Sequence, residues 1–240
     1  MKSNKDVCMR VYGMVTAVMM SVALTGCATQ NNEDPMESLN RGVFQFNEVV
    51  DGIVLKPVAR SYRFITTPYM RDRVSGVAQN LGEPITVANA LLQGDVNRSF
   101  IAFWRFMLNS TVGIGGMFDV ASTAGLNYRS EDFGQTLGAW GVGSGPYVVL
   151  PILGPSNGRD IVGLVADYFT DPFHYAMEDN TDDFYYAAAK GIEKRERLLD
   201  PIDDIYESSI DPYVSLRSIY TQKRDAEIKN SYDYSDKGQF

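Results

Sequence analysis

The chain has 240 residues and a net charge of −8, which suits one large domain or two small ones. This acidic balance argues against nucleic-acid binding, where basic patches supply most of the affinity, and against broad electrostatic adhesion to anionic lipid headgroups. A hydrophobic content of 45% is ordinary for a globular fold.

The first 26 residues have the pattern of a secretory signal peptide. Lys2, Lys5 and Arg10 give a positive start, and an apolar run follows over residues 11–24. The run is short for a membrane span, which needs about 20 apolar residues. We therefore expect residues 1–26 to be a signal peptide that is removed from the mature protein.

A cysteine lies where such a signal would be cleaved. Leu24-Thr25-Gly26-Cys27 resembles the lipobox of bacterial lipoproteins, which implies cleavage before Cys27 and acylation of its thiol and its amine. Several acyl chains give a lasting membrane anchor. The alternatives are an ordinary signal with a chance cysteine, or an uncleaved anchor. Ala28, at the position after the cysteine, favours the outer membrane by the same resemblance.

The rest of the chain is predicted to be almost all helical. Apolar residues recur at spacings of three and four, and proline, glycine and capping residues mark the ends of the elements. Residues 27–33 form a polar tether, and residues 229–240 form a polar tail that we expect to be disordered. The predicted helices begin near Asp34-Pro35, Pro57, Thr67-Pro68, Ile85, Asp95, Met117, Gly158, Thr181, Pro201 and Asp211-Pro212, with a break at Glu83-Pro84.

The helix predicted over Val96 to Val112 is apolar around most of its circumference, which is typical of a deeply buried helix or one that faces lipid. Arg98 and Arg105 interrupt it and need partners or a polar surface.

The stretch from Glu131 to Asp160 combines many glycines and prolines with large apolar residues. Exposed loops seldom do so, and we interpret it as a tight apolar hairpin that other segments surround. Tyr147 to Leu150 is the one strand-like run in the sequence. The spacing of Gly134 and Gly138 is explained by close backbone packing without a ligand.

The residues of common active sites are not grouped in this sequence. His174 is the single histidine, and Ser144 lacks the Gly-x-Ser-x-Gly context of a hydrolase nucleophile. Gly141 to Gly145 lacks the lysine of a phosphate-binding loop, and there is no Cys/His cluster for a metal. We expect no enzyme activity, no cofactor and no metal.

Several blocks, in matching order over about residues 34–225, resemble the MlaA/VacJ family of outer-membrane lipoproteins. Each block alone is weak, and together they are specific. They are DPMESLNR (34–41) with FQFN (44–47), KPVA (56–59), NALLQGD (89–95), RFMLNST (105–111), GIGGMFDV (113–120), FGQTLGAWGVGSGPYVVLP (133–151) and SIDPY (209–213).

The resemblance implies an all-α fold: a single helical domain over residues 34–228, forming a ring of short and long helices around an amphipathic channel, with a Gly-rich hairpin. It also implies a function. Phospholipids misplaced in the outer leaflet would pass through the channel to a periplasmic lipid carrier (MlaC-like), trimeric porins would hold the ring, and outer-membrane lipid asymmetry would be maintained without hydrolysis.

The resemblance also implies site residues. The hairpin would border the channel and gate it, and an N-terminal helix would lie beside the channel; packing alone is the alternative for both. For Arg98 and Arg105, a salt bridge inside the ring is favoured over a phosphate contact. The hairpin residues are Trp140, Gly141, Val142, Gly143, Gly145, Pro146, Tyr147, Val148, Val149, Leu150 and Pro151, and the helix residues are Phe44, Phe46 and Asn47.

Two other functions stay open at this point. One is a lipoprotein phospholipase acting on the same lipids, against which the missing nucleophile motif counts. The other is a passive scaffold that docks a porin.

Overall fold

The computed structural model describes residues 34–173 and 180–229. The predicted signal peptide, the lipidation site Cys27, the tether, His174 and nearly all of the polar tail lie outside the described residues.

Helices make up most of the described chain, as predicted. They are joined by a π-helical segment, η1, and by one pair of short strands. In chain order the elements are α2 (Glu37–Val50), η1 (Asp51–Leu55), α3 (Lys56–Ile65), α4 (Pro68–Leu92), α5 (Val96–Thr111), α6 (Val120–Thr123), α7 (Phe133–Ala139), β1 (Tyr147–Leu150), β2 (Gly154–Asn157), α8 (Gly158–Thr170), α10 (Asn180–Arg197), α11 (Leu199–Ser208) and α12 (Pro212–Ile228).

Two predicted helix breaks are wrong. The helix does not restart at Pro57, because α2, η1 and α3 run on without interruption and Pro57 lies in the first turn of α3, where a proline is tolerated. Pro84 lies inside the continuous helix α4. There α4 packs along α5, and this tertiary contact outweighs the local cost of the proline.

The predicted caps are largely confirmed. The side chain of Thr67 accepts a hydrogen bond from Met70 N at the start of α4, and Asp95 does the same for Arg98 N at the start of α5. Asp211 caps α12 through Val214 N. The structure places the start of α2 at Glu37 rather than directly after Asp34. Asp34 Oδ1 nevertheless accepts a hydrogen bond from Met36 N at 3.3 Å, while its side chain is buried among other segments.

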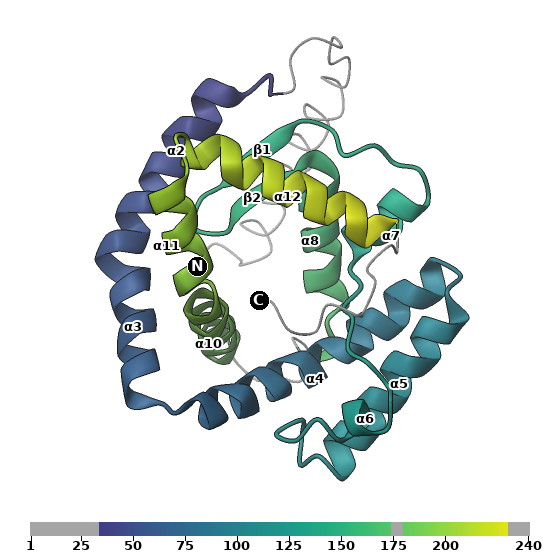
Figure 1. Ribbon diagram of the computed structural model, residues 1–240. Coiled ribbons are helices and arrows are strands. Elements are labelled where there is room, and N and C mark those ends of the chain that lie inside the picture. The colour runs from purple at the N-terminus through teal and green to yellow at the C-terminus, as the bar shows by residue number, and fades with distance from the viewer. Residues whose placement is uncertain (1–33, 174–179, 230–240) are drawn as a thin grey trace, which may run out of the picture.

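The elements follow one another around a ring (Figure 1). The α2–η1–α3 rod forms one side, α4 forms the next with α5 packed along it, and α7, α8, the strands and α12 complete the outline. Contacts between α12 and α7, and between α2 and β1, close the ring. Helices α10 and α11 lie against the inner side of α3.

The Gly-rich stretch is more than a hairpin, and the prediction for it needs correction. Its first part is a helix, α7, which sequence reasoning missed because two of its seven residues are glycine and one is the β-branched threonine. Only the part from Tyr147 to Asn157 is a β-hairpin, with Tyr147 opposite Asn157 and Leu150 opposite Gly154. The second strand was not predicted because Gly-Pro-Ser-Asn has little β propensity.

The interior is polar and the surface is rich in apolar groups. Among the residues that the structure describes, nineteen polar or charged residues are buried against eight hydrophobic ones, four of which are alanine. Large apolar side chains are instead exposed on α2, α3, α4, α5, α8, α10 and α12. This distribution is the reverse of a soluble globular domain. No helix in the described ranges is both long enough and apolar enough to cross a membrane.

The deepest ion pair joins α4 to α5. The Arg105 side chain is 2% exposed, and its Nε donates to Glu83 Oε1 at 2.6 Å. Nη1 donates to Ser122 Oγ and to the Leu126 carbonyl, and Nη2 lies 3.2 Å from Asp119. Burial raises the pKa of Glu83 to about 7, against the lowering effect of Arg105. The predicted salt bridge inside the ring is confirmed for Arg105, and Arg98 likewise pairs with Glu131.

Glycine allows α7 and α8 to pack with their backbones in contact. A Cβ on Gly163 would lie 2.3 Å from Gly134 N, and a Cβ on Gly134 would lie 2.6 Å from Arg224 Nη2. At Gly163 the neighbours are backbone atoms of α7, so a larger side chain requires the helices to move apart. At Gly134 the neighbours are the side chains of Arg224, Asp160 and Asp132, which would have to shift.

We therefore predict that Gly163→Ala lowers the free energy of unfolding by about 1–3 kcal/mol, the usual cost of overpacking. The matched control is Gly191→Ala, because a Cβ at that helical position meets nothing within 4 Å. The control should gain about 0.5–1 kcal/mol from helix propensity. Urea unfolding of the detergent-solubilised chain, followed by circular dichroism, measures both, and equal stability of the two variants would contradict the close packing.

Candidate functional site: the hairpin and the helices that hold it

The edge of β1 that does not face β2 is bound by a side chain of α2. Asn40 Nδ2 donates to the Tyr147 carbonyl at 2.9 Å, and Asn40 Oδ1 accepts from Val149 N at 2.9 Å. One amide side chain thus pairs with the backbone of alternate residues, as a neighbouring strand would. Asn40 itself is oriented by Asp34, whose Oδ1 accepts from Asn40 Nδ2 at 3.0 Å.

A second asparagine, two turns further along α2, holds the tip of the hairpin. Asn47 Nδ2 donates to the Leu150 carbonyl at 2.9 Å, and its Oδ1 accepts from Ile152 N at 2.7 Å. Ile152 has a φ of +66°, a left-handed conformation that is costly for a β-branched residue. The hydrogen bond to Asn47 therefore helps to fix the shape of the turn.

The hairpin base is packed in a small aromatic cluster. Tyr147 and Val149 are buried with Tyr213 of α12, and Phe44 of α2 lies edge-on to Tyr213 with ring centroids 5.7 Å apart. The Tyr213 hydroxyl donates to Asp34, which links α12 to the asparagine that holds β1. Burial next to Asp34 raises the pKa of Tyr147 to about 12, so this hydroxyl stays protonated at neutral pH.

The tip differs from the base because its side chains face solvent. Ile152 is 60% exposed and Leu153 is 66% exposed, and Pro151 is exposed beside them. Val148 and Leu150 are partly buried. The hairpin therefore presents an apolar tip. Among the side chains of the described residues, only Asn47 forms hydrogen bonds with the backbone of this tip.

The segment from Trp140 to Pro146 connects α7 to β1. Gly141 N donates to the Gly138 carbonyl and Val142 N to the Leu137 carbonyl, a Schellman motif in which Gly141 takes a φ of +88°. Trp140 is exposed, and its Nε1 donates to the Leu92 carbonyl of α4 at 3.0 Å. Gly145 also has a positive φ, and Pro146 and Ser144 accept hydrogen bonds from the first amides of α8.

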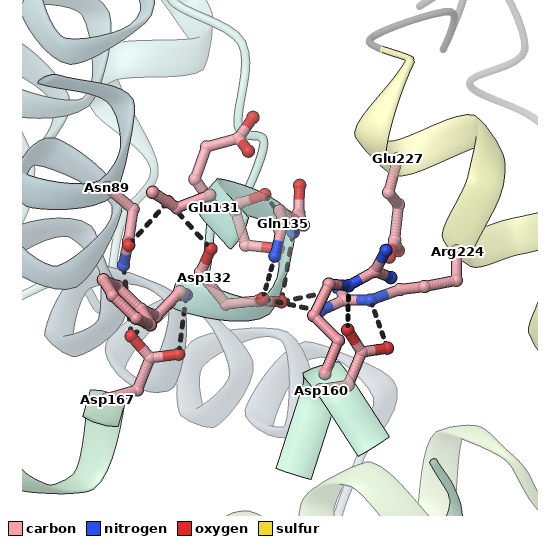
Figure 2. Close-up of polar contacts among 12 residues, drawn as sticks. Asn89, Glu131, Asp132, Gln135, Asp160, Asp167, Arg224 and Glu227 are labelled. Carbon is pink, nitrogen blue, oxygen red and sulfur yellow. Dashed lines mark hydrogen bonds and ion pairs between the residues drawn. The ribbon is translucent and has the colours of Figure 1, made fainter. Parts of the chain in front are cut away.

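A polar network holds the base of the hairpin from the other side (Figure 2). Arg224 of α12 donates from Nη1 and Nη2 to Asp132 at 2.7 and 2.6 Å, and from Nε to Asp160 at 2.8 Å. Asp132 caps α7 through Gln135 N, so Arg224 ties a helix cap to α12. The pKa of Asp132 is lowered because its hydrogen bonds and ion pair with Arg224 outweigh the raising effect of its burial.

The same network includes the last residue of β2. Asn157 Oδ1 accepts from Asp160 N and caps α8, and its Nδ2 donates to Asp160 Oδ2 at 2.8 Å. The Tyr220 hydroxyl donates to Asp160 Oδ2 at 2.5 Å. Arg224 therefore fixes α7, α8 and the end of the hairpin at once.

A second cluster joins α4 to α7 and α8 in the same view (Figure 2). Asp167 accepts from Phe133 N at 3.0 Å and from Asn89 Nδ2 at 3.1 Å, and the Thr136 hydroxyl donates to Asn89 Oδ1 at 2.8 Å. Burial raises the pKa of Asp167 to about 6, and these hydrogen bonds offset part of that shift. Within residues 34–173 and 180–229, no group of His, Cys, Asp and Glu side chains could hold a metal.

The predicted site residues are brought together only in part. Asn47 contacts the hairpin directly and Phe44 packs in the cluster at its base, whereas Phe46 is exposed. Tyr147 and Val149 have buried side chains, and the remaining hairpin residues lie nearer the surface. Whether any of them borders a channel stays a prediction.

Sequence reasoning missed Asn40, Asn157 and Arg224 as site residues. The spacing of Asn40 and Asn47 could have indicated a shared role, because positions seven residues apart lie on one face of a helix. The partners of Arg224 come from segments 64 and 92 residues away, and no local pattern could reveal them.

The fold and the site define a ring of helices with a polar interior, an apolar exterior and one β-hairpin held by asparagines of the first helix. The model of the family described as MlaA lipoprotein matches residues 32–227. A relative in Escherichia coli (strain K12), the intermembrane phospholipid transport system lipoprotein MlaA, is 36% identical over 214 residues, covering 88% of this chain and 84% of the relative. The protein of the same name in Haemophilus influenzae is 32% identical and covers 89% of each chain.

Further similarities agree with these. An uncharacterized protein of Rickettsia prowazekii (strain Madrid E) is 40% identical over 197 residues, covering 82% of this chain and 78% of that protein. A solved structure described as the structural basis for maintenance of bacterial outer membrane lipid asymmetry is 38% identical, with a TM-score of 0.74, over 82% of this chain and 100% of that chain. The chain belongs to the MlaA lipoprotein family, which confirms the resemblance seen in the sequence.

The asparagine that holds the hairpin tip gives a direct test. We predict that Asn47→Ala raises amide hydrogen exchange at Ile152 about thirtyfold, because two hydrogen bonds of about 1 kcal/mol each are lost. Asn97→Ala is the control, since Asn97 is exposed on α5. Exchange at Ile152 that is the same in wild type and Asn47→Ala would show that other contacts hold the tip.

The ion pairs of Arg224 give a second test. Arg224→Gln leaves Asp132 without its cation and Asp160 with Arg159 alone, and we expect it to lower the free energy of unfolding by about 3 kcal/mol, the lower end for a buried pair because Asp132 is partly exposed. The neighbouring Lys223→Gln should cost at most about 0.5 kcal/mol, because Lys223 is 62% exposed and lies 3.8 Å from Glu227. Chemical unfolding of both variants measures these free energies. Similar losses of stability in the two variants would mean that Arg224 does not hold the helices together.

Proposed function

We propose that this chain is an outer-membrane lipoprotein that removes phospholipids mislocalised in the outer leaflet. The phospholipids pass through the ring to a periplasmic lipid carrier, and the transfer maintains the lipid asymmetry of the membrane. The observation that carries the proposal is the reversed distribution of side chains, with charged pairs such as Glu83–Arg105 inside and large apolar groups outside. The names of the relatives in E. coli and H. influenzae, which are phospholipid transport lipoproteins, support it.

The exposed apolar residues support embedding of the ring in the membrane from the periplasmic side. Helix α5 turns a continuous apolar face outward, away from its contact with α4. Its exposed members are Val96, Phe100, Phe103, Trp104 and Met107. A surface of this kind is unfavourable in water and favourable among acyl chains. In this proposal the ring lies in the inner part of the outer membrane.

The hairpin is the proposed gate of the lipid path. Its base is fixed by Asn40 and by the aromatic cluster, while its apolar tip is held by the single side chain of Asn47. An element with a rigid base and a weakly held tip can change position without unfolding the ring. In this proposal Val148, Leu150 and Ile152 meet acyl chains, and Tyr147 and Val149 hold the hairpin in place.

The anchor and the partners complete the proposal. Acylated Cys27 would attach the ring to the membrane, trimeric porins would hold it there, and an MlaC-like carrier would receive the lipid. These parts come from the family resemblance and from the signal sequence around Cys27.

The proposal predicts the phenotype of a strain that lacks this protein. Outer-leaflet phospholipid should rise, as measured by sensitivity of intact cells to an added phospholipase. Wild type should restore the normal level, and Cys27→Ala should not, because the unanchored chain is lost from the membrane. Immunoblots of membrane fractions control for expression.

Two outcomes would replace the proposal with one of the open alternatives. An unchanged outer leaflet in the deletion strain, together with co-purification of a porin with the wild-type protein, would favour a porin-docking scaffold. Release of fatty acid from phosphatidylethanolamine by the purified protein would favour a phospholipase.

A further inference from the structure

Arg73 on α4 differs from the other arginines of the described chain in its partners. Every other arginine in residues 34–173 and 180–229 lies within ion-pair distance of a carboxylate. Among those same residues, no carboxylate pairs with Arg73, and its buried Nε has no hydrogen-bond acceptor. In a chain with a net charge of −8, a carboxylate partner would be easy to supply.

Two aromatic rings hold this guanidinium in place. Its Cζ lies 4.6 Å from the centroid of the Tyr69 ring and 5.0 Å from that of Phe118. Cation–π contacts of this kind orient a guanidinium and leave its N–H groups free to meet an anion. The side chain as a whole is partly exposed, so an external group can reach it.

The surroundings of Arg73 are apolar and open. Tyr69 is 60% exposed, Met70 49% and Val74 42%, all on the same part of α4. The loop after α5 adds exposed Met117 and Phe118. This loop is in contact with α4, because a Cβ on Gly76 would lie 2.4 Å from the Gly116 carbonyl oxygen.

We propose that Arg73 binds the phosphate of a membrane phospholipid whose acyl chains lie against these apolar side chains. The proposal rests on the membrane-embedded ring of the proposed function, and it adds a headgroup-binding residue on α4, away from the hairpin. The ligand is a phosphodiester with two acyl chains: the phosphate satisfies the unpaired cation, and the chains cover Tyr69, Met70 and Val74. A carboxylate of a partner protein would satisfy only the cation.

The arrangement also explains why an arginine is suited to this position. A planar guanidinium can stack between Tyr69 and Phe118 and still donate two parallel hydrogen bonds to a phosphate. A lysine keeps the charge and loses both the stacking and the paired donors. The two residues should therefore differ at this site.

The test uses the full-length protein, purified in detergent and stripped of lipid, with retained lipid counted by native mass spectrometry. The probes are dioleoyl phosphatidylglycerol, dioleoylglycerol, which has the same chains without phosphate, and inorganic phosphate alone. We expect Arg73→Gln to weaken retention of phosphatidylglycerol about tenfold, the scale of one charge-assisted contact, and Arg73→Lys to weaken it less. Dioleoylglycerol should be retained equally by wild type and Arg73→Gln, and inorganic phosphate should not bind.

Arg60→Gln is the matched control, because Arg60 is an exposed arginine on α3 that pairs with Asp203 at 3.3 Å, and it should retain phosphatidylglycerol like wild type. Circular dichroism confirms that each variant is folded. Equal retention by wild type and Arg73→Gln overturns the proposal, and so does a parallel loss of dioleoylglycerol, which would show that Arg73 only supports packing. Binding of inorganic phosphate with similar affinity would indicate a simple anion site, and loss of porin co-purification with unchanged lipid retention would indicate a protein partner.

These outcomes are separate from the fate of the proposed function. Lipid retention is measured on purified protein, so the proposal about Arg73 can be overturned while the deletion strain still loses lipid asymmetry. Conversely, an unchanged outer leaflet in the deletion strain would remove the transport role and leave the phosphate site measurable.

Discussion

The buried ion pair between Arg105 and Glu83 is the interaction on which the ring most depends. A ring has no central apolar core, so its helices must be joined pairwise along their lengths. Arg105 reaches Glu83 on α4, Ser122 on α6 and the Leu126 carbonyl beyond it, and thereby connects three segments through one side chain. Arg224 has the same role elsewhere in the ring, where it joins α12 to the cap of α7 and to the first turn of α8. In both places charged groups replace the apolar packing of a soluble domain, and the several hydrogen bonds that each guanidinium donates offset the cost of its burial.

This constraint separates a rigid frame from a single adjustable element. Glycines at 134 and 163 let α7 and α8 approach until their backbones touch, and the Arg224 network then fixes them to α12. The hairpin is joined to this frame at Asn157, and Asn40 of α2 binds its first strand. Only at the tip does the support reduce to one residue, Asn47. A lipid gate needs this division, because a movable tip is useful only when the surrounding ring keeps its shape.

Most of the helices could be predicted from the sequence, because caps and apolar stripes are local signals. Asp95 and Thr67 cap the helices that their sequence contexts indicated. The errors occur where tertiary contacts outweigh local preference: Pro84 stays inside α4, and the glycines of α7 form a helix. The site was predictable in outline through Asn47 and the Tyr147 strand, whereas the Arg224 network depends on residues far apart in the chain. The reversed burial also escaped sequence reasoning, since periodicity marks an apolar face without telling whether protein or lipid covers it.

The apolar face of α5 and the unpaired guanidinium of Arg73 follow from the same reversed distribution of polar and apolar side chains. When charged groups are placed inside a ring, each needs a partner from the chain itself, and the described arginines other than Arg73 have one. Outside the ring, the proposed membrane embedding would supply the neighbours: acyl chains for exposed Phe100 and Trp104, and phosphates for a cation. In this proposal an arginine that contacts Tyr69 and Phe118 at such a surface meets an anion only when it binds lipid. The unpaired cation and the exposed aromatic residues, each unfavourable in water, become mutually consistent once the outer surface of the ring is a lipid-binding surface.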